Sequence, residues 1–527
     1  MSKSAFYLTT AIDYTNASPH IGHAYEKLLA DVIARYARAQ GREVFFLTGV
    51  DQHGQKVQQS AEREGVDPKT FAEANTARFL ALWDRMDIRF DGWAATTHPL
   101  HQRAVRYVLQ RLHDSGQLYK ASHRGFYSLR QEQFITVKER REDGSFGPEW
   151  GEVVDLEEEN WYFRLSDHFP WLESFLESHP GFVFPEFRLR EVLNAIHSAG
   201  AGDLCISRPK SRLSWGIDLP FDPEFVTYVW FDALLNYISF AGYLRKVAES
   251  GDPDGVLPDF DKLWPADIHL IGKDIMIPAH AVYWPIMLHA LGFSDDEMPR
   301  LVVHGFWNDR RGHKVSKSEG NAIDPATRID RFGTDGLRYY LMASIATGQD
   351  AGFNDDRVLE LYNQDLANGL GNLLSRSLNM SGRYRQGVIS VSAAYDDDLS
   401  RALRHAFLDL AGDVALHMKT HQVHLALEEI WKRVTLCNQY VEHCAPWKLA
   451  KDPASAPRLD AVLRHLVEAL AHIAVHIAPV MPSTSREILR QLDLELPNPF
   501  PLSNLRWGLV PDRHQLGAPH PLFPRLA

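Results

Sequence analysis

The sequence predicts an α/β protein in which a doubly wound parallel sheet is split by an inserted domain and followed by a bundle of helices. A strand–helix–strand pattern opens the chain, and the same alternation returns after a long polar interruption. Strand signals then vanish beyond about Asp355, where amphipathic helical patterns remain. A length of 527 residues exceeds what one hydrophobic core usually organises, so two or three domains are expected.

The first α/β unit begins almost at the N-terminus. Residues 5–12 are apolar or β-branched and predict a strand, and residues 13–19 predict a turn. Apolar residues then recur at helical spacing until Gly41, just before a second apolar strand at 44–47. Such a unit is the building block of a doubly wound, Rossmann-type parallel sheet.

The polar interruption predicts an inserted domain. The α/β alternation is lost after Phe90, and residues 118–161 are polar, strongly charged and Gly-containing. The alternation resumes near 227–230, continues through the strand HLIGK and closes with the strand LVVHG at 301–305. We therefore expect a sheet whose strands come from two separate stretches of sequence.

Long amphipathic segments predict the helical bundle, and they lie at residues 363–384, 397–420, 423–444 and 458–478. No repeat of fixed period runs through them, which favours a compact bundle over a solenoid. The most apolar stretch, 462–482, contains Arg, Glu and His residues, which are too many ionisable groups for a membrane span. We therefore expect no membrane partner.

Charge and cysteine content limit the function classes. The formal net charge of −12 argues against broad, sequence-blind nucleic-acid binding, although a local basic face stays possible. The three cysteines, Cys205, Cys437 and Cys444, lack the paired spacing of a disulfide framework or of a Cys-built zinc site. The N-terminal residues do not resemble a signal peptide, so a reduced, cytoplasmic setting is expected.

The motif His20-Ile21-Gly22-His23 lies where the first strand leads into the first helix. A helix N-terminus favours anions, Gly22 lets a ligand approach the backbone, and two imidazoles can donate to phosphate oxygens, which suits ATP. Taken alone, the pair is as often a helix cap with one satisfied histidine. A shared zinc ion is a weaker alternative, because no third ligand follows at a usual spacing.

A second motif, Lys314-Val315-Ser316-Lys317-Ser318, lies in a Gly- and Asn-bearing loop after the strand LVVHG. Two lysines on such a loop can close over a polyphosphate, although an isolated KxSKS is more often a solvated basic turn. Both motifs follow strands of the same predicted sheet, and no GxxxxGK[ST] or complete GxGxxG loop occurs in the chain. Together the two motifs predict one ATP site.

The two motifs resemble the signatures of class I aminoacyl-tRNA synthetases, in which the second is normally written KMSKS, so that Val315 departs from the pattern. Longer segments are similar to those of methionyl-tRNA synthetases in family order: NASPHIGHAYEKLLADVIARY, FFLTGVDQHGQKV, YVWFDALLNYIS, IGKDI and HGFWNDRRGHKVSKSEGN. The resemblance spans nearly the whole chain. It implies an enzyme that activates L-methionine with ATP and Mg²⁺ to methionyl-adenylate and transfers it to the 3′ end of tRNA(Met).

The resemblance implies that four residues stabilise the charge of the reacting phosphates: His20, His23, Lys314 and Lys317. The implied ATP-binding set adds Gly22 and Ser316 to these. No protein nucleophile is required, because the carboxylate of methionine itself attacks the α-phosphorus in this chemistry.

For methionine, Asp51 matches the acid that holds the ammonium group in the family. A carboxylate at the carboxyl edge of a parallel sheet can face a ligand crevice, whereas an isolated Asp after a strand is more often a turn residue. The implied side-chain pocket is apolar and aromatic, although such a set is usually core: Ile12, Tyr14, Trp230, Ala233, Tyr237, His280 and Trp284. The stretch 272–280 is one residue longer than the usual family spacing, which predicts a local bulge.

In the helical region, Asn372, Arg376 and Trp447 match the positions that read the CAU anticodon in the family. An unstacked base can lie on an indole, and Arg or Asn can bond its Watson–Crick edge. Residue types alone favour a structural interpretation instead. In that interpretation Trp447 fills the bundle, and Asn372 caps a helix or packs within it.

The inserted segment departs from the family. Family members often have CxxC zinc knuckles in this segment. The corresponding residues of this chain, 127–131 and 146–151, contain no cysteine, so we expect no structural zinc. Ordinary packing would then hold the insertion, with a small core of Phe126, Phe134, Trp150 and Trp161. The insertion is also too short for a separate editing domain, so discrimination falls to the synthetic pocket.

The resemblance divides the chain into catalytic halves at 1–117 and 226–325, a connective insertion at 118–225, a stem-contact linker at 326–355 and an α-helical anticodon-binding domain at 356–527. No appended C-terminal tRNA-binding or dimerisation module is expected. Two rival hypotheses remain: a smaller HIGH-type nucleotidylyltransferase, which would not need the bundle, and a non-catalytic synthetase relative.

Overall fold

A computed structural model describes residues 3–128, 133–135, 139–141, 143–198, 202–248, 255, 257–309, 311–313, 315, 322–391 and 397–527. The chain forms two compact units. Unit 1 comprises Met1–Ser18, Leu47–Leu80 and Phe90–Val303, and unit 2 comprises Pro19–Phe46, Ala81–Arg89 and His304–Ala527.

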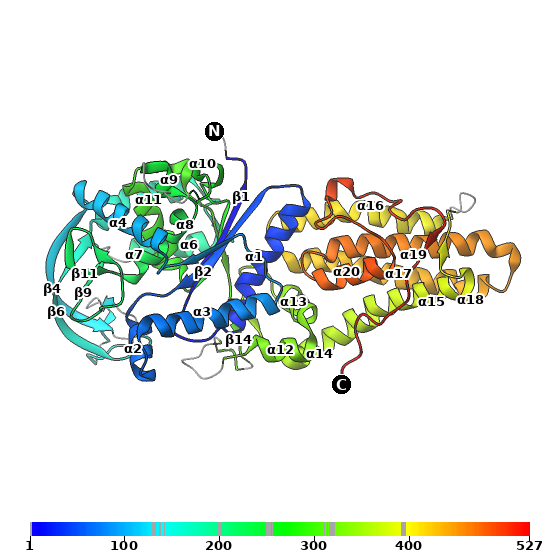
Figure 1. Cartoon of the computed structure of the whole chain (residues 1–527), viewed down its shortest axis with the longest axis horizontal. Coiled ribbons are helices and arrows are strands. Elements are labelled where there is room, and N and C mark those ends of the chain that lie inside the picture. Colours follow the sequence, from blue (N-terminus) through cyan, green and yellow to red (C-terminus); the bar gives the residue numbers. More distant parts are fainter. Residues whose placement is uncertain are drawn as a thin grey trace. The chain divides into compact units, whose positions relative to one another are not determined.

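The central sheet has six strands in the order β3-β2-β1-β12-β13-β7 (Figure 1). Their bounds are β1 Phe6–Tyr14, β2 Val44–Asp51, β3 Gly92–Ala95, β7 Val183–Phe184, β12 Ile268–Gly272 and β13 Leu301–His304. The pairs β1/β12, β2/β3 and β13/β7 are parallel. Successive strands run outward from β1 on one side, and the chain returns through β12 on its other side. This reversal of strand order is the switch point at which doubly wound sheets bind ligands, and the predicted fold class is confirmed.

Two expectations about the sheet are wrong. The alternation does not end at Phe90, because β3 and the helix α4 (Pro99–Asp114) continue it. Strand β7 lies within the segment expected to form the insertion, yet it pairs with β13 in the central sheet. Both strands are too short to show a period, and β3 (GWAA) is poor in β-branched residues, which explains why neither was predicted.

The insertion is built on two long antiparallel strands, β4 (Leu118–Ser128) and β6 (Val153–Phe163), paired from Leu118↔Phe163 to Ser128↔Val153. Strands β5 (Gln133–Ile135) and β8 (Leu204–Cys205) complete this sheet, and β10 (Asp218–Leu219), β11 (Asp222–Thr227) and β9 (Ser207–Pro209) form a smaller one. The core residues expected here are wrong, because Phe126, Trp150 and Trp161 are half-buried. The side chain of Phe134 lies outside the described residues.

Tyr127 and Phe163 are instead fully buried. Tyr127 is the neighbour of Phe126 on β4, and adjacent residues of a strand face opposite sides of the sheet. The face of β4 that carries Tyr127 is therefore the buried one, and the face that carries Phe126 is not.

The helical region contains α14 (Asp355–Leu361), the π-helix η6 (Tyr362–Gly371), α15 (Asn372–Arg385), α16 (Asp398–Met418), α17 (Val423–Cys444), α18 (Pro446–Leu449), α19 (Ala456–Ile477) and α20 (Pro482–Gln491). Helices α15, α16, α17 and α19 lie side by side (Figure 1). These match the expected segments, and the predicted bundle is confirmed. Helix α20 and the antiparallel pair β16/β17 (Val388–Ile389, His514–Gln515) were not predicted.

The other elements are α1 Ile21–Ala39, α2 Gln55–Glu64, α3 Pro68–Arg85, η2 Pro148–Trp150, η3 Leu165–His168, α5 Phe169–Ser178, α6 Glu186–Ser198, α7 Val229–Leu234, α8 Asn236–Ser239, α9 Tyr243–Val247, α10 Phe260–Leu263, η4 Met276–Tyr283, α11 Trp284–Ala290, η5 Asp295–Glu297, β14 Trp307–Asn308, α12 Pro325–Phe332, α13 Thr334–Ala343, β15 Ala351–Gly352, η7 Pro453–Ser455 and η8 Leu502–Asn504.

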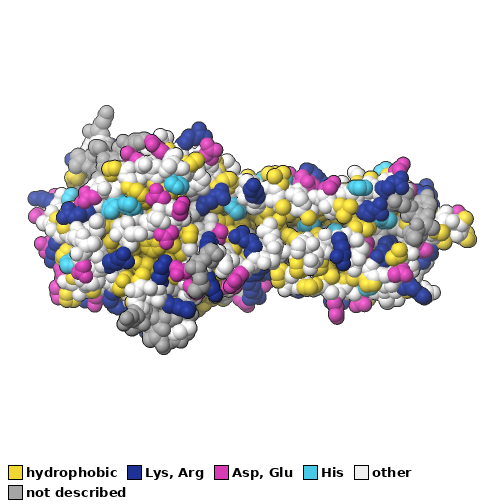
Figure 2. Space-filling view, turned by 90° about the horizontal axis from the view of Figure 1, so that it is seen from above, with side chains coloured by type: hydrophobic (Ala, Val, Ile, Leu, Met, Phe, Trp, Pro, Cys, Tyr) yellow, Lys and Arg dark blue, Asp and Glu magenta, His cyan; other side chains and the backbone are white. Residues whose placement is uncertain are grey.

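Basic and acidic side chains are interspersed on the face seen in Figure 2, in keeping with the formal net charge of −12. Within the described residues, no helix combines the length and the apolar character that crossing a membrane requires.

Candidate active site

The first turn of α1 carries the HIGH motif. His20 is the N-cap of the helix, and its Nδ1 accepts the backbone N–H of Gly22 at 3.1 Å. The Nδ1 of His23 accepts the backbone N–H of His20, also at 3.1 Å. The two rings lie against each other with their centroids 3.9 Å apart. The capping interpretation is therefore confirmed, and both imidazoles serve it.

Capping also determines what the two rings can offer a ligand. A ring nitrogen that accepts a backbone N–H carries no proton, so the proton of each neutral ring is on Nε2. Both side chains then present an N–H donor in addition to their capping role. A Cβ on Gly22 would lie 2.9 Å from Cε1 of His20, so glycine is needed because the ring of His20 lies over it.

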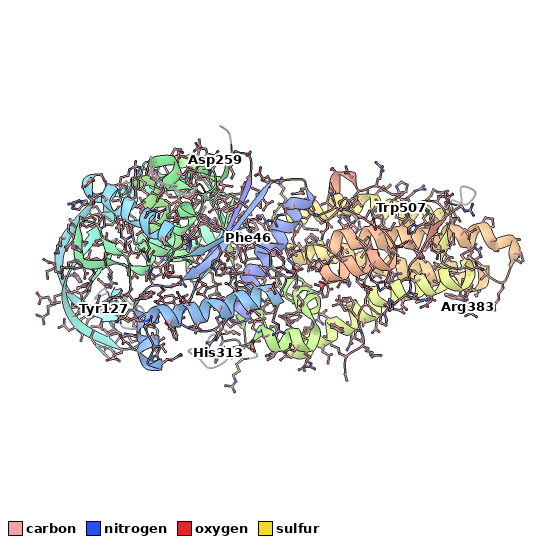
Figure 3. All side chains as sticks on the ribbon, in the orientation of Figure 1. Phe46, Tyr127, Asp259, His313, Arg383 and Trp507 are labelled. Carbon is pink, nitrogen blue, oxygen red and sulfur yellow. The ribbon has the colours of Figure 1, made fainter. Side chains whose placement is uncertain are left out.

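The second motif lies largely outside the described residues, including Lys314, Ser316 and Lys317. The base of its loop is described: Val315 is buried, and its N–H bonds to the carbonyl oxygen of Trp307 at 3.2 Å. A turn precedes it, in which Asp309 accepts the backbone N–H of His313, a residue labelled in Figure 3.

The far end of this loop adjoins the HIGH motif. The backbone N–H of Ile21 donates to the carbonyl oxygen of Ile323 at 3.0 Å. The chain thus leaves the KVSKS segment beside the first turn of α1, within unit 2.

Asp51 is the last residue of β2, which runs further than predicted, and only 6% of its surface is exposed. Its Oδ1 accepts the N–H of His53 at 3.3 Å and the hydroxyl of Thr96 at 3.4 Å. Its carbonyl oxygen accepts both the N–H and the hydroxyl of Thr15 at 3.0 Å. The carboxylate is therefore held at the carboxyl end of a central strand. Its burial argues against the alternative that Asp51 is only a turn residue, because a turn residue would be more exposed.

Three of the predicted methionine-pocket residues meet in unit 1. The hydroxyl of Tyr237 lies 2.7 Å from Nε2 of His280, and its ring centroid lies 5.7 Å from that of Trp284. All three side chains are nearly fully buried. The cluster is therefore part of the buried core of unit 1.

His269 on β12 completes this cluster. It stacks on Tyr237 with centroids 4.2 Å apart, and its two ring nitrogens contact the Thr9 hydroxyl at 2.6 Å and the indole N–H of Trp284 at 3.2 Å. Burial lowers the pKa of His269 well below its ordinary value, so the ring is neutral at physiological pH.

The predicted bulge before His280 is confirmed. Residues Met276–Tyr283 form the π-helix η4, and Ile277 departs from helical geometry within it (φ −113°, ψ 128°). The chain therefore kinks at Ile277, shortly before His280, and both His280 and Trp284 are buried.

The remaining pocket residues lie on β1 and α7. Ile12, Tyr14 and Trp230 are half-buried, and Ala233 is buried. Gly54 brings the two elements together: a Cβ there would lie 2.4 Å from the Tyr14 hydroxyl and 3.2 Å from Cγ2 of Val229. Its φ of +104° is also one that favours glycine.

Sequence reasoning missed a buried acid between Trp230 and Ala233. The carboxylate of Asp232 accepts from Nδ1 of His53 at 2.7 Å and from Nε2 of His101 at 2.8 Å. Burial would raise the pKa of Asp232, but the two imidazoles outweigh it and hold the pKa below its ordinary value. A single acid in the apolar run VWFDALL was the signal, because a buried charge requires partners.

A second missed group lies on α1 in unit 2. The Glu26 carboxylate contacts Nζ of Lys27 at 2.7 Å and Nε2 of His304 at 2.9 Å. All three side chains are buried, and His304 ends the strand that precedes the KVSKS loop. Burial would raise the pKa of Glu26, but Lys27 and His304 lower it below its ordinary value.

The predicted anticodon residues also gather. The guanidinium of Arg376 lies 5.9 Å from the ring of Trp447 and forms an ion pair with Glu442 at 2.7 Å. Asn372 lies one turn earlier on α15 and is exposed. Trp447 is half-buried rather than enclosed by the bundle. Arg376 and Trp447 thus lie beside each other, and Asn372 lies on the same helix as Arg376.

At the position of the first expected zinc knuckle, Tyr127 (labelled in Figure 3) packs against two arginines. The guanidinium of Arg212 lies 4.6 Å from its ring and that of Arg208 lies 5.7 Å away. Arg208 also lies 4.5 Å from the ring of Tyr228, and Arg212 pairs with Glu158 at 2.9 Å. Across the described ranges, no three His, Cys, Asp or Glu side chains gather as metal ligands would.

A family model for class I tRNA synthetases, described as "tRNA synthetases class I (M)", matches residues 6–141 and 151–378. Together with the doubly wound sheet and the capped HIGH turn, this match defines the protein as a class I tRNA synthetase.

Named relatives narrow the class. A methionine–tRNA ligase of Caldanaerobacter subterraneus is 38% identical over 99% of this chain and 79% of its own length, and one of Clostridium perfringens is 38% identical over 100% and 79%. The solved structure of Mycobacterium tuberculosis methionyl-tRNA synthetase in complex with methionyl-adenylate is similar with a TM-score of 0.88 and 36% identity, covering 100% of both chains. The chain belongs to the methionine–tRNA ligases, the enzymes that activate methionine and charge tRNA with it.

Proposed function

We propose that this chain forms methionyl-adenylate from L-methionine and ATP and then transfers the methionyl group to the 3′ end of tRNA(Met). The observation that carries the ATP assignment is the first turn of α1, where both imidazoles cap backbone N–H groups through Nδ1 and so keep Nε2–H donors. Donors of this kind, placed at a helix N-terminus, suit a triphosphate.

In the first step, an oxygen of the methionine carboxylate forms a bond to the α-phosphorus, and the bond from that phosphorus to pyrophosphate breaks. His20, His23, Lys314 and Lys317 stabilise the charge on the phosphates, with Gly22 and Ser316 beside them. Mg²⁺ would be held chiefly by the phosphate oxygens, whose charge it neutralises. In the second step, the terminal ribose hydroxyl of the tRNA attacks the adenylate carbonyl carbon and AMP leaves.

Asp51 would hold the ammonium group of methionine, and Ile12, Tyr14, Trp230, Ala233, Tyr237, His280 and Trp284 would surround its side chain. Support for this role comes from the position of Asp51 at the end of a central strand and from the contacts that anchor it. A flexible thioether gains dispersion from aromatic walls of the kind that Tyr237 and Trp284 provide.

Asn372, Arg376 and Trp447 would read the anticodon, which places tRNA recognition within 356–527. The other roles follow the expected division: catalysis at 1–117 and 226–325, connection at 118–225 and stem contact at 326–355. A cytoplasmic location is proposed from the substrates, since translation uses tRNA there.

Methionine-dependent exchange of pyrophosphate into ATP, measured across the standard amino acids, tests the activity. Exchange with methionine alone is expected. No exchange with any amino acid would favour the non-catalytic relative, and exchange without tRNA charging would favour the nucleotidylyltransferase. Lys317→Ala should slow exchange by about 3 kcal/mol of activation free energy, and an unchanged rate would refute its role.

Two tryptophan variants separate tRNA reading from chemistry. Trp447→Ala should impair charging of tRNA(Met) while leaving exchange nearly intact. Trp431→Ala is the matched control. Trp431 is also half-buried in the bundle, but its ring packs against that of Tyr339, with the ring centroids 4.5 Å apart. It should reduce stability without selectively reducing charging. Equal loss of exchange and charging in Trp447→Ala would indicate a folding role instead.

A further inference from the structure

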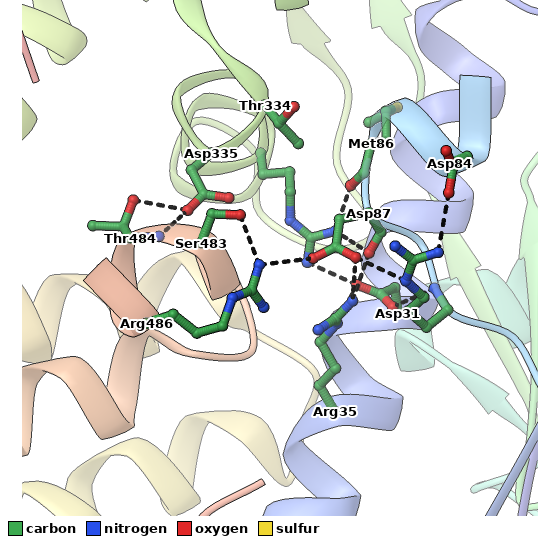
Figure 4. A network of polar contacts seen from close by, with 12 residues as sticks. Asp31, Arg35, Asp84, Met86, Asp87, Thr334, Asp335, Ser483, Thr484 and Arg486 are labelled. Carbon is green, nitrogen blue, oxygen red and sulfur yellow. Dashed lines mark hydrogen bonds and ion pairs between the residues drawn. The ribbon is translucent and has the colours of Figure 1, made fainter. Parts of the chain in front are cut away.

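Arg338 on α13 belongs to a polar network within unit 2, of which Asp31, Asp87 and Asp335 are labelled in Figure 4. It is fully buried, and each of its five N–H groups has an acceptor. The acceptors are the carbonyl oxygens of Val480 (2.7 Å), Met86 (2.9 Å), Asp87 (3.2 Å) and Pro479 (2.9 Å) and Oδ2 of Asp31 (2.7 Å).

One of these acceptors lies on the helix that begins with the HIGH motif. Asp31 is fully buried on α1, and its Oδ2 also accepts from Arg35 at 2.8 Å. Its Oδ1 accepts the backbone N–H of Arg89 at 3.0 Å. Because an α-helix of this length is stiff, a side chain that fixes Asp31 also fixes the first turn of α1, which carries His20.

Two other acceptors belong to the bundle. The carbonyls of Pro479 and Val480 follow the C-terminus of α19, where a helix leaves acceptors unpaired and favours a cation. One turn before Arg338, Asp335 accepts the N–H and hydroxyl of Thr484 at 2.5 and 2.7 Å in the first turn of α20. Helix α13 thus holds both sides of the corner between α19 and α20, with a cation at the carbonyl end and an anion at the amide end.

The segment before α13 makes a second contact with α1. The Ile21–Ile323 backbone bond joins the HIGH turn to the residue preceding the N-cap of α12. Helices α12 and α13 therefore hold α1 near its start and again at Asp31. Arg338 makes the second of these attachments, and it also bonds directly to the bundle through the carbonyl oxygens of Pro479 and Val480.

We infer that Arg338 is a positioning residue: it fixes helix α1, and with it His20 and His23, to the corner between α19 and α20, so that the placement of the bundle sets the placement of the imidazoles. The kinetic consequence rests on the proposed function. Asp335 bonds to Thr484 at the same corner, so its loss should loosen this corner while leaving the Arg338–Asp31 contact in place.

The variant Arg338→Lys tests the inference. A lysine keeps the charge but has three donors and no planar fork, so it cannot satisfy the five acceptors. The rate constant kcat for methionine-dependent exchange should fall on the order of 10- to 100-fold, because small misplacements of a reacting group have effects of that size. KM for methionine should change by less than about twofold.

Arg433→Lys is the matched control. Arg433 is a half-buried arginine of the bundle. It bonds to Asp413, Glu429 and the carbonyl oxygen of Ala406, which lie on α16 and α17 rather than on α1. It should lower the thermal midpoint comparably and leave kcat for exchange unchanged. Equal loss of kcat in the two variants, at similar thermal midpoints, would overturn the inference, as would an unchanged kcat in folded Arg338→Lys.

Two further variants keep the inference testable if Arg338→Lys does not fold. Asp31→Asn should lower kcat for exchange, because it weakens the contact between Arg338 and α1. Asp335→Asn should lower kcat for exchange less than Asp31→Asn does, because the Arg338–Asp31 contact remains, and a larger loss in Asp335→Asn would overturn the inference. If the wild-type enzyme shows no methionine-dependent exchange, the proposed function itself fails, whereas normal wild-type exchange with unaffected Arg338 and Asp31 variants refutes the positioning role alone.

Discussion

The carboxylate of Asp232 lies 2.7 Å from Nδ1 of His53, and this contact joins the helix that carries Trp230 and Ala233 to the segment that follows Asp51. The two segments are distant in sequence and hold the two halves of the proposed methionine site. His101 on α4 binds the other carboxylate oxygen, and its second nitrogen lies 2.7 Å from the hydroxyl of Ser239. A buried polar network with every member bonded specifies one arrangement of its elements.

Asp232→Asn should therefore disturb methionine binding more than ATP binding. An amide offers one acceptor where the carboxylate offers two, so one buried imidazole loses its partner at a cost of about 3 kcal/mol in stability. KM for methionine in pyrophosphate exchange should rise about tenfold, equivalent to about 1.4 kcal/mol, with KM for ATP unchanged. Ser239→Ala removes only the hydrogen bond between Ser239 and His101, and it should lower the free energy of unfolding by about 1 kcal/mol. Parallel increases in both KM values would contradict the assignment.

Gly54→Ala should damage the same site for a steric reason. The new Cβ would lie 2.4 Å from the Tyr14 hydroxyl at a φ of +104°, so the Tyr14 side chain or the loop must shift. We expect a stability loss of about 1–3 kcal/mol and a raised KM for methionine. Gly65→Ala is the control, because φ is +69° there but nothing lies within 4 Å of the added atom. If the two variants have the same KM, Tyr14 is not part of the pocket.

Asp51→Asn should weaken binding of the methionine ammonium group. Removing the charged partner of a buried ion pair costs about 2–5 kcal/mol, so KM for methionine should rise at least roughly 30-fold. A methionine analogue without the amino group provides the control measurement. It should inhibit the wild type and the variant equally, and a weaker inhibition of the variant would show that Asp51 acts through folding instead.

The bundle should lose stability at mildly acidic pH. Burial lowers the pKa of His472 to about 4 and that of His476 to about 3, whereas an unfolded histidine has a pKa of about 6.5. Because the folded pKa values are depressed, the unfolded chain binds more protons below about pH 6.5. The contribution of these two histidines to stability is constant above that pH and falls as the pH decreases, by on the order of 1.4 kcal/mol per pH unit for each histidine.

Urea unfolding between about pH 7 and about pH 5 measures this slope. His476→Leu should remove one histidine's share of it. His405→Leu, at an exposed position on α16, should leave the slope unchanged. A His476→Leu slope equal to that of the wild type would show that other groups cause the acid sensitivity.

The parts of the fold that were predicted correctly are those with a long period or a specific motif. Helix α1 and the bundle helices α16, α17 and α19 repeat their apolar residues over many turns, and they lie close to their expected positions. Strands β3 and β7 and the pair β16/β17 have two to four residues each, and no period can be detected over that length. Strands β3 and β7 pair with β2 and β13 of the central sheet, and β16 and β17 pair with each other, so each depends on a partner distant in sequence.

The candidate site divides in the same way. The motifs identified Asp51 and the HIGH residues, and all three of Tyr237, His280 and Trp284 proved to be neighbours. Asp232 and Arg338 were not predicted, because their importance lies in partners far away in sequence: His53 and His101 for the acid, and Asp31, Pro479 and Val480 for the arginine.

By itself the sequence determined the fold class, the long helices, the chemistry available to hold a triphosphate and an amino acid, and the family. Local spacing and residue type decide those properties, since they depend on neighbours along the chain. Only the tertiary structure decided which face of β4 is buried, that both HIGH imidazoles serve as caps, and that one guanidinium joins the HIGH helix to the bundle. Each of these depends on which distant groups meet once the chain has folded, because a buried charge or donor is stable only where a partner waits for it.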